Sequence, residues 1–493
     1  MSTTFVWHTV EHWVREAPSH PAVVTACSST TYADLARTSA ALSARLVEHS
    51  AGAGDRIAFF LPNGSGFVAA FLSIMRIGGV AVPLNVNYQQ EELKYYVRSS
   101  GARLIITDSA RLSKLNAMLG QLEERPRIVL IEEAAGTPAQ SLPAVPVSPD
   151  QPAIHQYSTG STGQPKPVIR TQGQLMAEVR HYGAAVRIVP SDRILTVVPM
   201  FHSHGFGNCL LAALMNGTTM VILESFNPRE VLSVLESERI TIYPGVPFMF
   251  KMLNETMLKS APDLSSLRLC FSAGGALDPA VSHAFHKRFG QHIRQLYGTT
   301  ETGSITINLG DDIETSLESV GVAMPGIKLT VAGESGETLP AGEVGEIGIS
   351  SPAMTRGYEG LADVTKASFR NGYFFPGDVG RIDEQGRVFV TGRKTFFINV
   401  GGSKVDPAEV ERIIGAHPKV SEVVVLGVKT PYGGEIVKAV VVPREQCEVA
   451  EILEACHGKL AEYKLPKIVE FRAEIPRSPL GKVLRKYLVD SLN

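Results

Sequence analysis

Cysteine is scarce in this sequence, and the few cysteines follow no spacing that would pair them. The five are Cys27, Cys209, Cys270, Cys447 and Cys456, and no two of them form a C-x-x-C pair. An odd, scattered set is typical of free thiols in a reducing compartment. It argues against a disulfide framework or a cysteine-based zinc site.

Long apolar runs and strong net charge are also lacking. The most apolar stretches, such as residues 209–215, are too short to cross a bilayer, so no transmembrane segment is expected. The N-terminus has no basic region followed by an apolar block, and no signal peptide is predicted. The net charge is −2 without blocks of like charge, which points away from nucleic acid as a partner. We expect a cytoplasmic protein, either a monomer or a homodimer.

What the sequence does contain is a regular alternation of apolar strands and helices. With 493 residues the chain is too long for one compact core, so two or more domains are expected. Short apolar segments predict strands at 56–61, 103–107 and 267–272, and helical spacing predicts helices at 32–48 and 67–76. This alternation indicates an α/β fold with largely parallel sheets that are covered on both faces by helices.

The pattern changes in the last third of the chain. From about residue 318, glycine-punctuated segments predict a small antiparallel, β-barrel-like subdomain. Beyond residue 394, the expected elements form a small α+β unit. They are helices at 407–415 and 448–462 and strands at 420–426, 437–442 and 468–471.

One stretch, from Tyr157 to Val168, combines glycines and small hydroxyl side chains with a lysine. Glycines let backbone N–H groups turn around an anion, hydroxyls add short donors, and Lys166 supplies a full charge. The position of Lys166 does not fit a Walker loop, and no hydroxyl residue follows it. The stretch predicts a grip for a polyphosphate; a plain solvated turn is the alternative.

Three further glycine-rich segments follow, at 272–277, 297–303 and 377–402, with Lys482 near the end. The first two come directly after predicted strands. In open sheets of this kind ligands bind beyond the carboxyl ends of the strands, so both segments are candidates for a binding site.

Taken in this order, the segments resemble the adenylate-forming superfamily of acyl-CoA synthetases, peptide-synthetase adenylation domains and beetle luciferases. The most specific parts are Tyr-Ser-Thr-Gly-Ser-Thr-Gly-Gln-Pro-Lys at 157–166 and Tyr-Gly-Thr-Thr-Glu at 297–301. The resemblance covers nearly the whole chain. It implies a large N-terminal adenylation domain at 1–393 and a small, mobile C-terminal lid at 394–493. It also implies an enzyme that joins ATP and a carboxylic acid into acyl-AMP, releases pyrophosphate, and passes the acyl group to a thiol.

The resemblance assigns the nucleotide site residue by residue. Asp378 and Arg393 would hold the ribose, and Glu301 would position Mg²⁺. Adenine and the α-phosphate would lie against Gly274, Gly275, Tyr297, Gly298, Thr299 and Thr300. The β- and γ-phosphates would be held by Ser158, Thr159, Gly160, Ser161, Thr162, Gly163 and Lys166.

It also assigns the reacting end of the site. Lys482, in Ser-Pro-Leu-Gly-Lys, would reach the carboxylate and the α-phosphate together, and stabilise the charge that develops between them. His202 would lie between the acid pocket and the nucleotide, and Thr300 and Glu301 complete the catalytic set. The acyl pocket would be lined by His202, Tyr243, Gly245, Val246, Gly274 and Ala276. Gly401 and Gly402 would line the passage for the thiol arm, with a bare turn as the alternative.

The sequence departs from the family at several positions. Pro167 stands where glycine is usual, and proline favours an extended conformation at Lys166. Thr395 occupies the hinge position where Asp or Lys is usual, and Asn399 and Lys404 replace a lysine and a glutamine of the aryl-CoA ligases. No aspartate near His202 would bind an α-ammonium group, which favours fatty or aryl acids over α-amino acids.

Three functions remain open on the sequence alone. The first is an acyl-CoA synthetase that uses ATP, Mg²⁺ and coenzyme A. The second is a stand-alone ligase that loads an acyl carrier protein. The third is a non-catalytic relative that binds nucleotide or acyl groups, which only the two departures at Pro167 and Thr395 favour.

Overall fold

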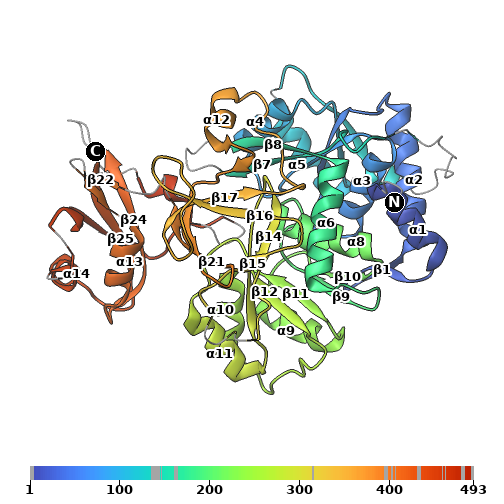
Figure 1. Cartoon of the computed structure of the whole chain (residues 1–493). Coiled ribbons are helices and arrows are strands. Elements are labelled where there is room, and N and C mark those ends of the chain that lie inside the picture. Colours follow the sequence, from blue (N-terminus) through green and yellow to red (C-terminus); the bar gives the residue numbers. More distant parts are fainter. Residues whose placement is uncertain are drawn as a thin grey trace.

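The computed structural model describes most of the chain. A large N-terminal part carries most of the helices and strands, and a smaller C-terminal part stands at one end of it (Figure 1). The residues described are 5–120, 122–134, 145, 147–159, 165–311, 313, 316–393, 398–400, 403–405, 407–429, 435–457, 459–460, 462–478 and 483–489.

A six-stranded sheet forms the first half of the N-terminal part, with the strand order β6-β5-β3-β4-β7-β8. Its strands pair in parallel except for the last pair, β7 and β8, which form an antiparallel hairpin. The strands are β3 (Arg56–Phe60), β4 (Val80–Pro83), β5 (Leu104–Thr107), β6 (Arg127–Leu130), β7 (Pro152–Thr159) and β8 (Pro165–Thr171). The helices are α1 (Val6–Glu16), α2 (Tyr32–Glu48), α3 (Ser65–Arg76), α4 (Gln90–Ser100) and α5 (Ser109–Leu119).

Local sequence explains these elements well. Strands β4 and β5 are buried at every position, as expected for parallel strands that helices cover on both faces. Helix α2 begins with a capping box, because the Thr31 side chain accepts from the Asp34 N–H and the Asp34 carboxylate accepts from the Thr31 N–H.

The second sheet is larger and changes character along its length. One end is mainly parallel and runs β2-β1-β10-β9-β11-β12-β13, and the other continues antiparallel as β14-β15-β21-β20-β17-β19-β18, with β16 beside β17. Its first strands are β1 (Pro21–Val24), β2 (Ser29–Thr31), β9 (Arg193–Thr196), β10 (Thr219–Ile222), β11 (Ile242–Gly245), β12 (Leu269–Ser272) and β13 (Ile293–Thr299). The others are β14 (Gly303–Ile307), β15 (Gly321–Ala323), β16 (Lys328–Ala332), β17 (Gly345–Ser350), β18 (Phe369–Arg370), β19 (Tyr373–Phe374), β20 (Asp378–Ile382) and β21 (Arg387–Arg393).

Helices pack around this sheet, and α9, α10 and α11 gather beside β11 and β12 (Figure 1). A π-helix at Phe206–Leu211 joins two short α-helices. The helices are α6 (Gln172–Val186), α7 (Ser203–Gly205), α8 (Ala212–Asn216), α9 (Pro228–Ser237), α10 (Pro247–Glu255), α11 (Pro279–Phe289) and α12 (Ala362–Ser368).

The C-terminal part has its own strands and its own core. Buried side chains such as Val410, Val441 and Ile452 form a cluster separate from the N-terminal core. Its strands are β22 (Ile398–Val400), β23 (Ser403–Val405), β24 (Val420–Lys429), β25 (Glu435–Pro443) and β26 (Ile468–Phe471), and its helices are α13 (Pro407–Gly415) and α14 (Val449–Cys456).

The predicted α/β class is confirmed, with two differences in detail. The antiparallel strands continue the large sheet edge to edge, and they close into no barrel within the described ranges. Helix α14 ends at Cys456, shorter than predicted. All five cysteines are free thiols, and among the described residues no helix is long and apolar enough to span a membrane.

His155 on β7 is a titratable side chain inside the N-terminal core. Its ring lies 4.8 Å from the ring of Tyr157, and neither ring nitrogen has a hydrogen-bond partner among the described residues. Burial, with a contribution from Arg56, lowers the pKa of His155 from 6.5 to about 4. The folded chain therefore keeps this imidazole neutral at pH values where the unfolded chain protonates it.

We expect the stability of the chain to depend on His155 between pH 6.5 and pH 4. The wild type should lose about 3 kcal/mol of its free energy of unfolding through this group as the pH falls across that window. His155→Leu should remove that loss in urea unfolding at a series of pH values. His283→Gln, at an exposed position on α11, is the control and should keep the wild-type pH dependence. Equal pH dependence in both variants would contradict the assignment.

Candidate active site

The hairpin of β7 and β8 carries the predicted phosphate grip. Its register places Ser158 opposite Lys166, and the Ser158 hydroxyl is buried with no hydrogen-bond partner among the described residues. Lys166 lies in extended backbone, as the proline after it predicts. The residues at the tip, Gly160, Ser161, Thr162 and Gly163, lie outside the described residues, as does the Thr159 side chain.

Pro167 is compatible with the pairing of β7 and β8. Its carbonyl oxygen accepts a hydrogen bond of 3.3 Å from the N–H of Glu359, in a segment on the side of β8 away from β7. In an extended strand the nitrogen and carbonyl of one residue point to the same side. The missing N–H of Pro167 therefore removes no hydrogen bond between β7 and β8, which is the position that a strand tolerates for proline.

A second hairpin, formed by β13 and β14, carries the predicted Tyr-Gly-Thr-Thr-Glu segment. A Cβ atom on Gly298 would lie 2.7 Å from the carbonyl oxygen of Gly303, so only glycine allows this close pairing. Glu301 sits in the turn with 6% of its surface exposed, and its Oε1 accepts a hydrogen bond of 2.8 Å from the Tyr358 hydroxyl. The Thr299 and Thr302 hydroxyls are 2.9 Å apart across the turn.

The predicted ribose contact, Asp378, is held by two donors from different strands. The Tyr297 hydroxyl donates to Oδ2 and the Arg393 Nε donates to Oδ1, each at 2.5 Å. Asp378 is 2% exposed. Burial, together with the adjacent Asp378 carboxylate, raises the pKa of Tyr297 above its ordinary value, so the phenol remains a donor. The structure thus brings together three residues that the sequence placed in one nucleotide site.

The segments after β11 and β12 lie side by side. A Cβ atom on Gly275 would lie 3.7 Å from Pro247, and one on Gly274, whose φ is +83°, would lie 4.0 Å from Val246. Gly274, Gly275 and Ala276 are exposed. Two of the predicted walls of the acyl pocket therefore meet at one edge of the sheet.

Tyr243 differs from the other predicted wall residues. It is fully buried on β11, its ring lies 5.4 Å from the ring of Phe250, and its hydroxyl donates to the Met249 sulfur. The side chain packs within the core, so its contact with an acyl group stays a prediction.

The segment of residues 202–204 contacts both the β13–β14 hairpin and β11. His202 is half-buried and directly precedes α7, without a side-chain capping hydrogen bond. The hydroxyls of Ser203 and Thr300 are 3.5 Å apart. His204 Nε2 is 3.0 Å from the carbonyl oxygen of Gly245, and its Nδ1 is 2.9 Å from the Asn208 amide nitrogen.

These contacts determine which ring nitrogen of His204 carries the hydrogen. Because Nε2 faces a carbonyl it carries the hydrogen, and Nδ1 accepts from Asn208, whose amide oxygen accepts from Ser304 at 2.7 Å. Burial lowers the pKa of His204 from 6.5 to about 4, so the ring is neutral near pH 7. His204 therefore joins β11, the π-helix and β14, while the gating role of His202 stays a prediction.

A buried ion pair lies behind both hairpins. Arg170 on β8 and Glu178 on α6 are ion-paired, and both side chains are almost completely shielded from solvent. A Cβ atom on Gly207 would lie 2.2 Å from the Glu178 carboxylate, and one on Gly303 would lie 2.3 Å from it. The π-helix and β14 can approach this carboxylate only because both positions are glycine.

At the C-terminal end, Lys482, Thr395, Gly401 and Gly402 lie outside the described residues. The flanks of the Lys482 segment are well anchored, since Arg477 and Val483 form a β-bridge and the N–H of Leu484 donates to Pro476. The buried Lys438 ammonium also donates to the Leu488 carbonyl at 2.9 Å.

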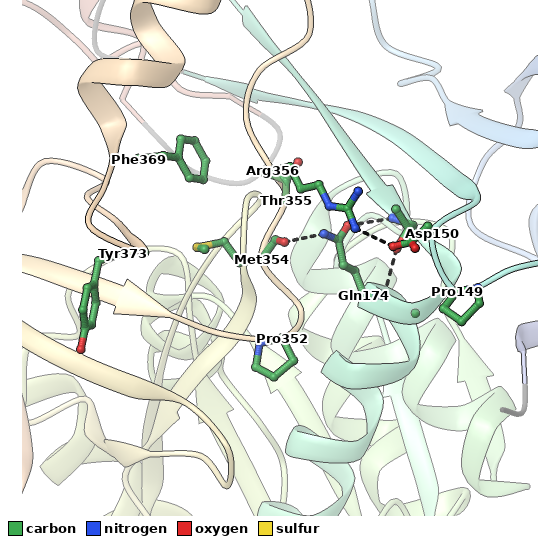
Figure 2. A pocket seen from close by; sticks show the side chains of 12 residues that line it. Pro149, Asp150, Gln174, Pro352, Met354, Thr355, Arg356, Phe369 and Tyr373 are labelled. Atoms are coloured by element: carbon green, nitrogen blue, oxygen red, sulfur yellow. Dashed lines mark hydrogen bonds and ion pairs between the residues drawn. The ribbon is translucent and has the colours of Figure 1, made fainter. Parts of the chain in front are cut away.

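A surface cavity of about 540 Å³ is lined in part by residues 352–356, the segment that also contacts Glu301. Figure 2 shows the ion pair between Arg356 and Asp150 at this cavity, and Gln174 donating to the Met354 carbonyl. The Arg356–Asp150 distance is 2.5 Å. Thr355 lines this cavity, and its N–H donates to the Glu301 carbonyl at 2.8 Å. None of the residues predicted for the nucleotide or acyl site lines the cavity, so the two sites are distinct.

Sequence reasoning missed the residues that connect the predicted segments. They are Tyr358, Arg170, Glu178, Asn208 and Ser304, and each lies outside the glycine-rich stretches. No spacing rule marks them. The only sequence signal is indirect: a glycine at 207 and at 303, each of which leaves room for the same carboxylate.

Removing one partner of the buried Arg170–Glu178 pair should strongly destabilise the folded chain. Arg170→Met should lower the free energy of unfolding by about 3–5 kcal/mol, because Glu178 is left charged and buried without a partner. Circular dichroism in urea measures this change. The double variant Arg170→Met/Glu178→Leu removes both charges and should recover most of the loss. A double variant as unstable as the single one would show that shape, not charge, governs this region.

The comparisons with known proteins agree with this geometry. The family model for the AMP-binding enzymes matches residues 10–359, and the model for the AMP-binding enzyme C-terminal domain matches residues 409–482. A feruloyl-CoA synthase of Amycolatopsis sp is 33% identical over 477 residues, which is 96% of each chain. The long-chain-fatty-acid–CoA ligase FadD13 of Mycobacterium tuberculosis is 31% identical over 88% of each chain.

A solved structure is similar over almost the full length. The ATP-bound form of MatB from Rhodopseudomonas palustris superposes with a TM-score of 0.89 at 28% identity, and 99% of each chain is covered. The order of the glycine-rich segments, the two matching family models and the full-length relatives lead to one conclusion: this chain belongs to the AMP-binding enzyme family, the adenylate-forming enzymes.

Proposed function

We propose that this protein activates a carboxylic acid with ATP, forming acyl-AMP and pyrophosphate, and transfers the acyl group to the thiol of coenzyme A. The observation that carries the proposal is the meeting of Tyr297, Asp378 and Arg393 beside the turn that holds Glu301. These groups suit a nucleotide, and the full-length relatives are named as CoA ligases of an aryl and a fatty acid.

The nucleotide would lie across the two hairpins. Asp378 would accept from the ribose hydroxyls, since a carboxylate has an oxygen for each. The open glycines after β12 and the Tyr297 ring offer faces for the adenine. Ser158 and Lys166 stand at the base of the loop whose tip, residues 159–163, would wrap the β- and γ-phosphates.

The site fits Mg²⁺ better than a metal that needs a complete protein cage. Among the described residues no cluster of three or more His, Cys, Asp or Glu side chains exists, while Glu301 offers one carboxylate near the phosphate hairpin. Mg²⁺ is commonly held by one or two carboxylates together with substrate phosphates. When bound, it would neutralise phosphate charge, and Glu301 would position it.

The chemical step brings two anions together. A carboxylate oxygen of the acid forms a bond to the α-phosphorus, and the bond to the pyrophosphate oxygen breaks. Lys482 would offset the charge that develops at the bridging oxygen, and Thr300 would donate to the α-phosphate. His202, at the N-terminus of α7, would orient the acid beside this point.

The acid is proposed to be a fatty or aryl acid. No acidic side chain lies between residues 199 and 205, where an α-ammonium group would need one. The neighbouring wall of Gly245, Val246 and Gly274 is small or apolar. The relatives with aryl and fatty substrates agree with this class but do not identify the acid.

For the second step, we propose a division of the chain at residues 393/394, with residues 394–493 acting as a lid. The separate hydrophobic cores on the two sides support this boundary. Gly401 and Gly402 would line the passage for the thiol, and Thr395 would be the hinge. Asn399 and Lys404 are paired in the register of the β22–β23 hairpin. An acyl carrier protein is the alternative acceptor.

A panel of acids tests the proposal. Purified protein should exchange labelled pyrophosphate into ATP only when an acid of the right class and Mg²⁺ are present, because exchange requires reversible formation of acyl-AMP. Fatty and aryl acids should support exchange, and α-amino acids should not. No exchange with any acid would favour a protein that only binds nucleotide. Coenzyme A and a purified carrier protein, offered together, identify the acceptor by which thiol becomes acylated.

Lys482→Ala separates the two half-reactions. It should slow acyl-AMP formation by about 100- to 1,000-fold, because the positive charge near the bridging oxygen is lost. Thioester formation from supplied acyl-AMP should be unchanged. Lys467→Ala, at an exposed position in the same domain, is the control and should alter neither rate. Equal loss of both half-reactions would contradict the role given to Lys482.

A further inference from the structure

The segment between β17 and α12 ties the two hairpins of the site together. We call residues 355–359 the strap. The Thr355 N–H donates to the carbonyl of Glu301 at 2.8 Å, and the Thr355 hydroxyl donates to the carbonyl of Ile169 on β8 at 2.6 Å. The strap also forms a β-bridge between Tyr358 and Val168. It therefore fixes the turn that holds Glu301 relative to the strand that follows the phosphate grip.

Tyr358 is the residue of the strap that touches both functional side chains. Its hydroxyl donates to Glu301 Oε1 at 2.8 Å, and the Lys166 Nζ lies 5.0 Å from the centre of its ring. The side chain is 6% exposed, and its ring packs edge-on against Phe369 at 5.7 Å. One buried phenol thus contacts the carboxylate proposed for the metal and the lysine proposed for the phosphates.

The two contacts use different parts of the tyrosine. The hydroxyl donates its hydrogen to the carboxylate, which can only accept. A donor on Oε1 fixes the rotation of the carboxylate and leaves Oε2 for another partner. The ring face attracts the ammonium of Lys166 without neutralising it.

Tyr358 also contacts two side chains of opposite charge, Lys166 and Glu301. Lys166 and Glu301 form no ion pair with each other, although both contact the same side chain. An ion pair between them would occupy the carboxylate that the metal needs and the ammonium that the phosphates need. The tyrosine holds each charge in place for its own ligand.

We propose that Tyr358 is the positioning residue for metal-bound triphosphate, because it orients Glu301 towards Mg²⁺ and keeps Lys166 available for the phosphates. The proposal rests on the function proposed above for Glu301 and Lys166. It goes further because it assigns a role to a residue outside the glycine-rich segments.

Tyr358→Phe tests the hydroxyl and keeps the ring. ATP affinity, measured by isothermal titration calorimetry with Mg²⁺ in excess, should fall by about 10-fold, as for other groups that orient metal ligands. Affinity in EDTA should stay within about twofold of the wild type, since no metal then depends on Glu301. The Mg²⁺ concentration for half-maximal pyrophosphate exchange should rise in parallel. Thioester formation from supplied acyl-AMP should not change.

Tyr373→Phe is the matched control, because Tyr373 lines the surface cavity and does not contact Glu301 or Lys166. It should behave as the wild type in all these measurements. If Tyr358→Phe binds ATP with Mg²⁺ as tightly as the wild type, the proposal is wrong. An equal loss in EDTA would also overturn it, since that result indicates a structural defect and not a role towards the metal.

Tyr358→Leu removes the ring as well as the hydroxyl. Affinity for ATP in EDTA should now also fall, by about two- to fivefold, because Lys166 loses its cation–π contact. If this variant does not fold, Tyr358→Phe still decides the proposal. Failure of the proposed reaction can be told apart from failure of the positioning role. If the wild type shows no acid-dependent exchange, the proposed reaction is wrong. If its ATP affinity with Mg²⁺ nevertheless requires the Tyr358 hydroxyl, the positioning role still holds.

Discussion

The buried ion pair of Arg170 and Glu178 is the constraint around which the site is arranged. Its charges lie in the core, where an unpaired charge would be strongly destabilising, so β8 and α6 must keep their relative positions. The Glu178 carboxylate also fills the space that Gly207 and Gly303 leave open. Four elements from separate parts of the sequence therefore meet at one carboxylate, and two of them, β8 and β14, belong to the hairpins of the proposed nucleotide site.

From this centre, hydrogen bonds extend through the π-helix to the end of β11. Asn208, on the π-helix, accepts from Ser304 on β14 and holds the ring of His204. His204 in turn contacts Gly245 at the end of β11. A π-helix places its residues out of register with the α-helices on either side, and such insertions are frequent at functional sites. Here Gly207 lies against Glu178 on α6, while the next residue, Asn208, contacts Ser304 on β14.

The sequence predicted the parallel part of the fold well, because apolar strands buried on both faces leave a clear signal. Residues 103–107, for example, were predicted as a strand, and Leu104–Thr107 form the buried parallel strand β5. The β7–β8 hairpin and α6 were not predicted, since α6 buries polar residues such as Gln172, Gln174 and Glu178 and lacks a simple apolar face. Tyr358 was not predicted as a site residue for a different reason. Its partners Glu301 and Lys166 are distant in sequence, and only the folded chain brings them together.

The geometry around Asp378 matches what the proposed ribose contact requires. A carboxylate has about four lone-pair sites, two on each oxygen. Tyr297 occupies one site on Oδ2 and Arg393 one site on Oδ1. One site remains on each oxygen, which matches the two hydroxyls of a ribose. A ribose bound as proposed would displace neither protein donor, and the carboxylate would already be fixed when the sugar arrives. Arg393 ends β21 and lies two residues before the proposed hinge, Thr395. The same ion pair would therefore link ribose binding to the start of the proposed lid.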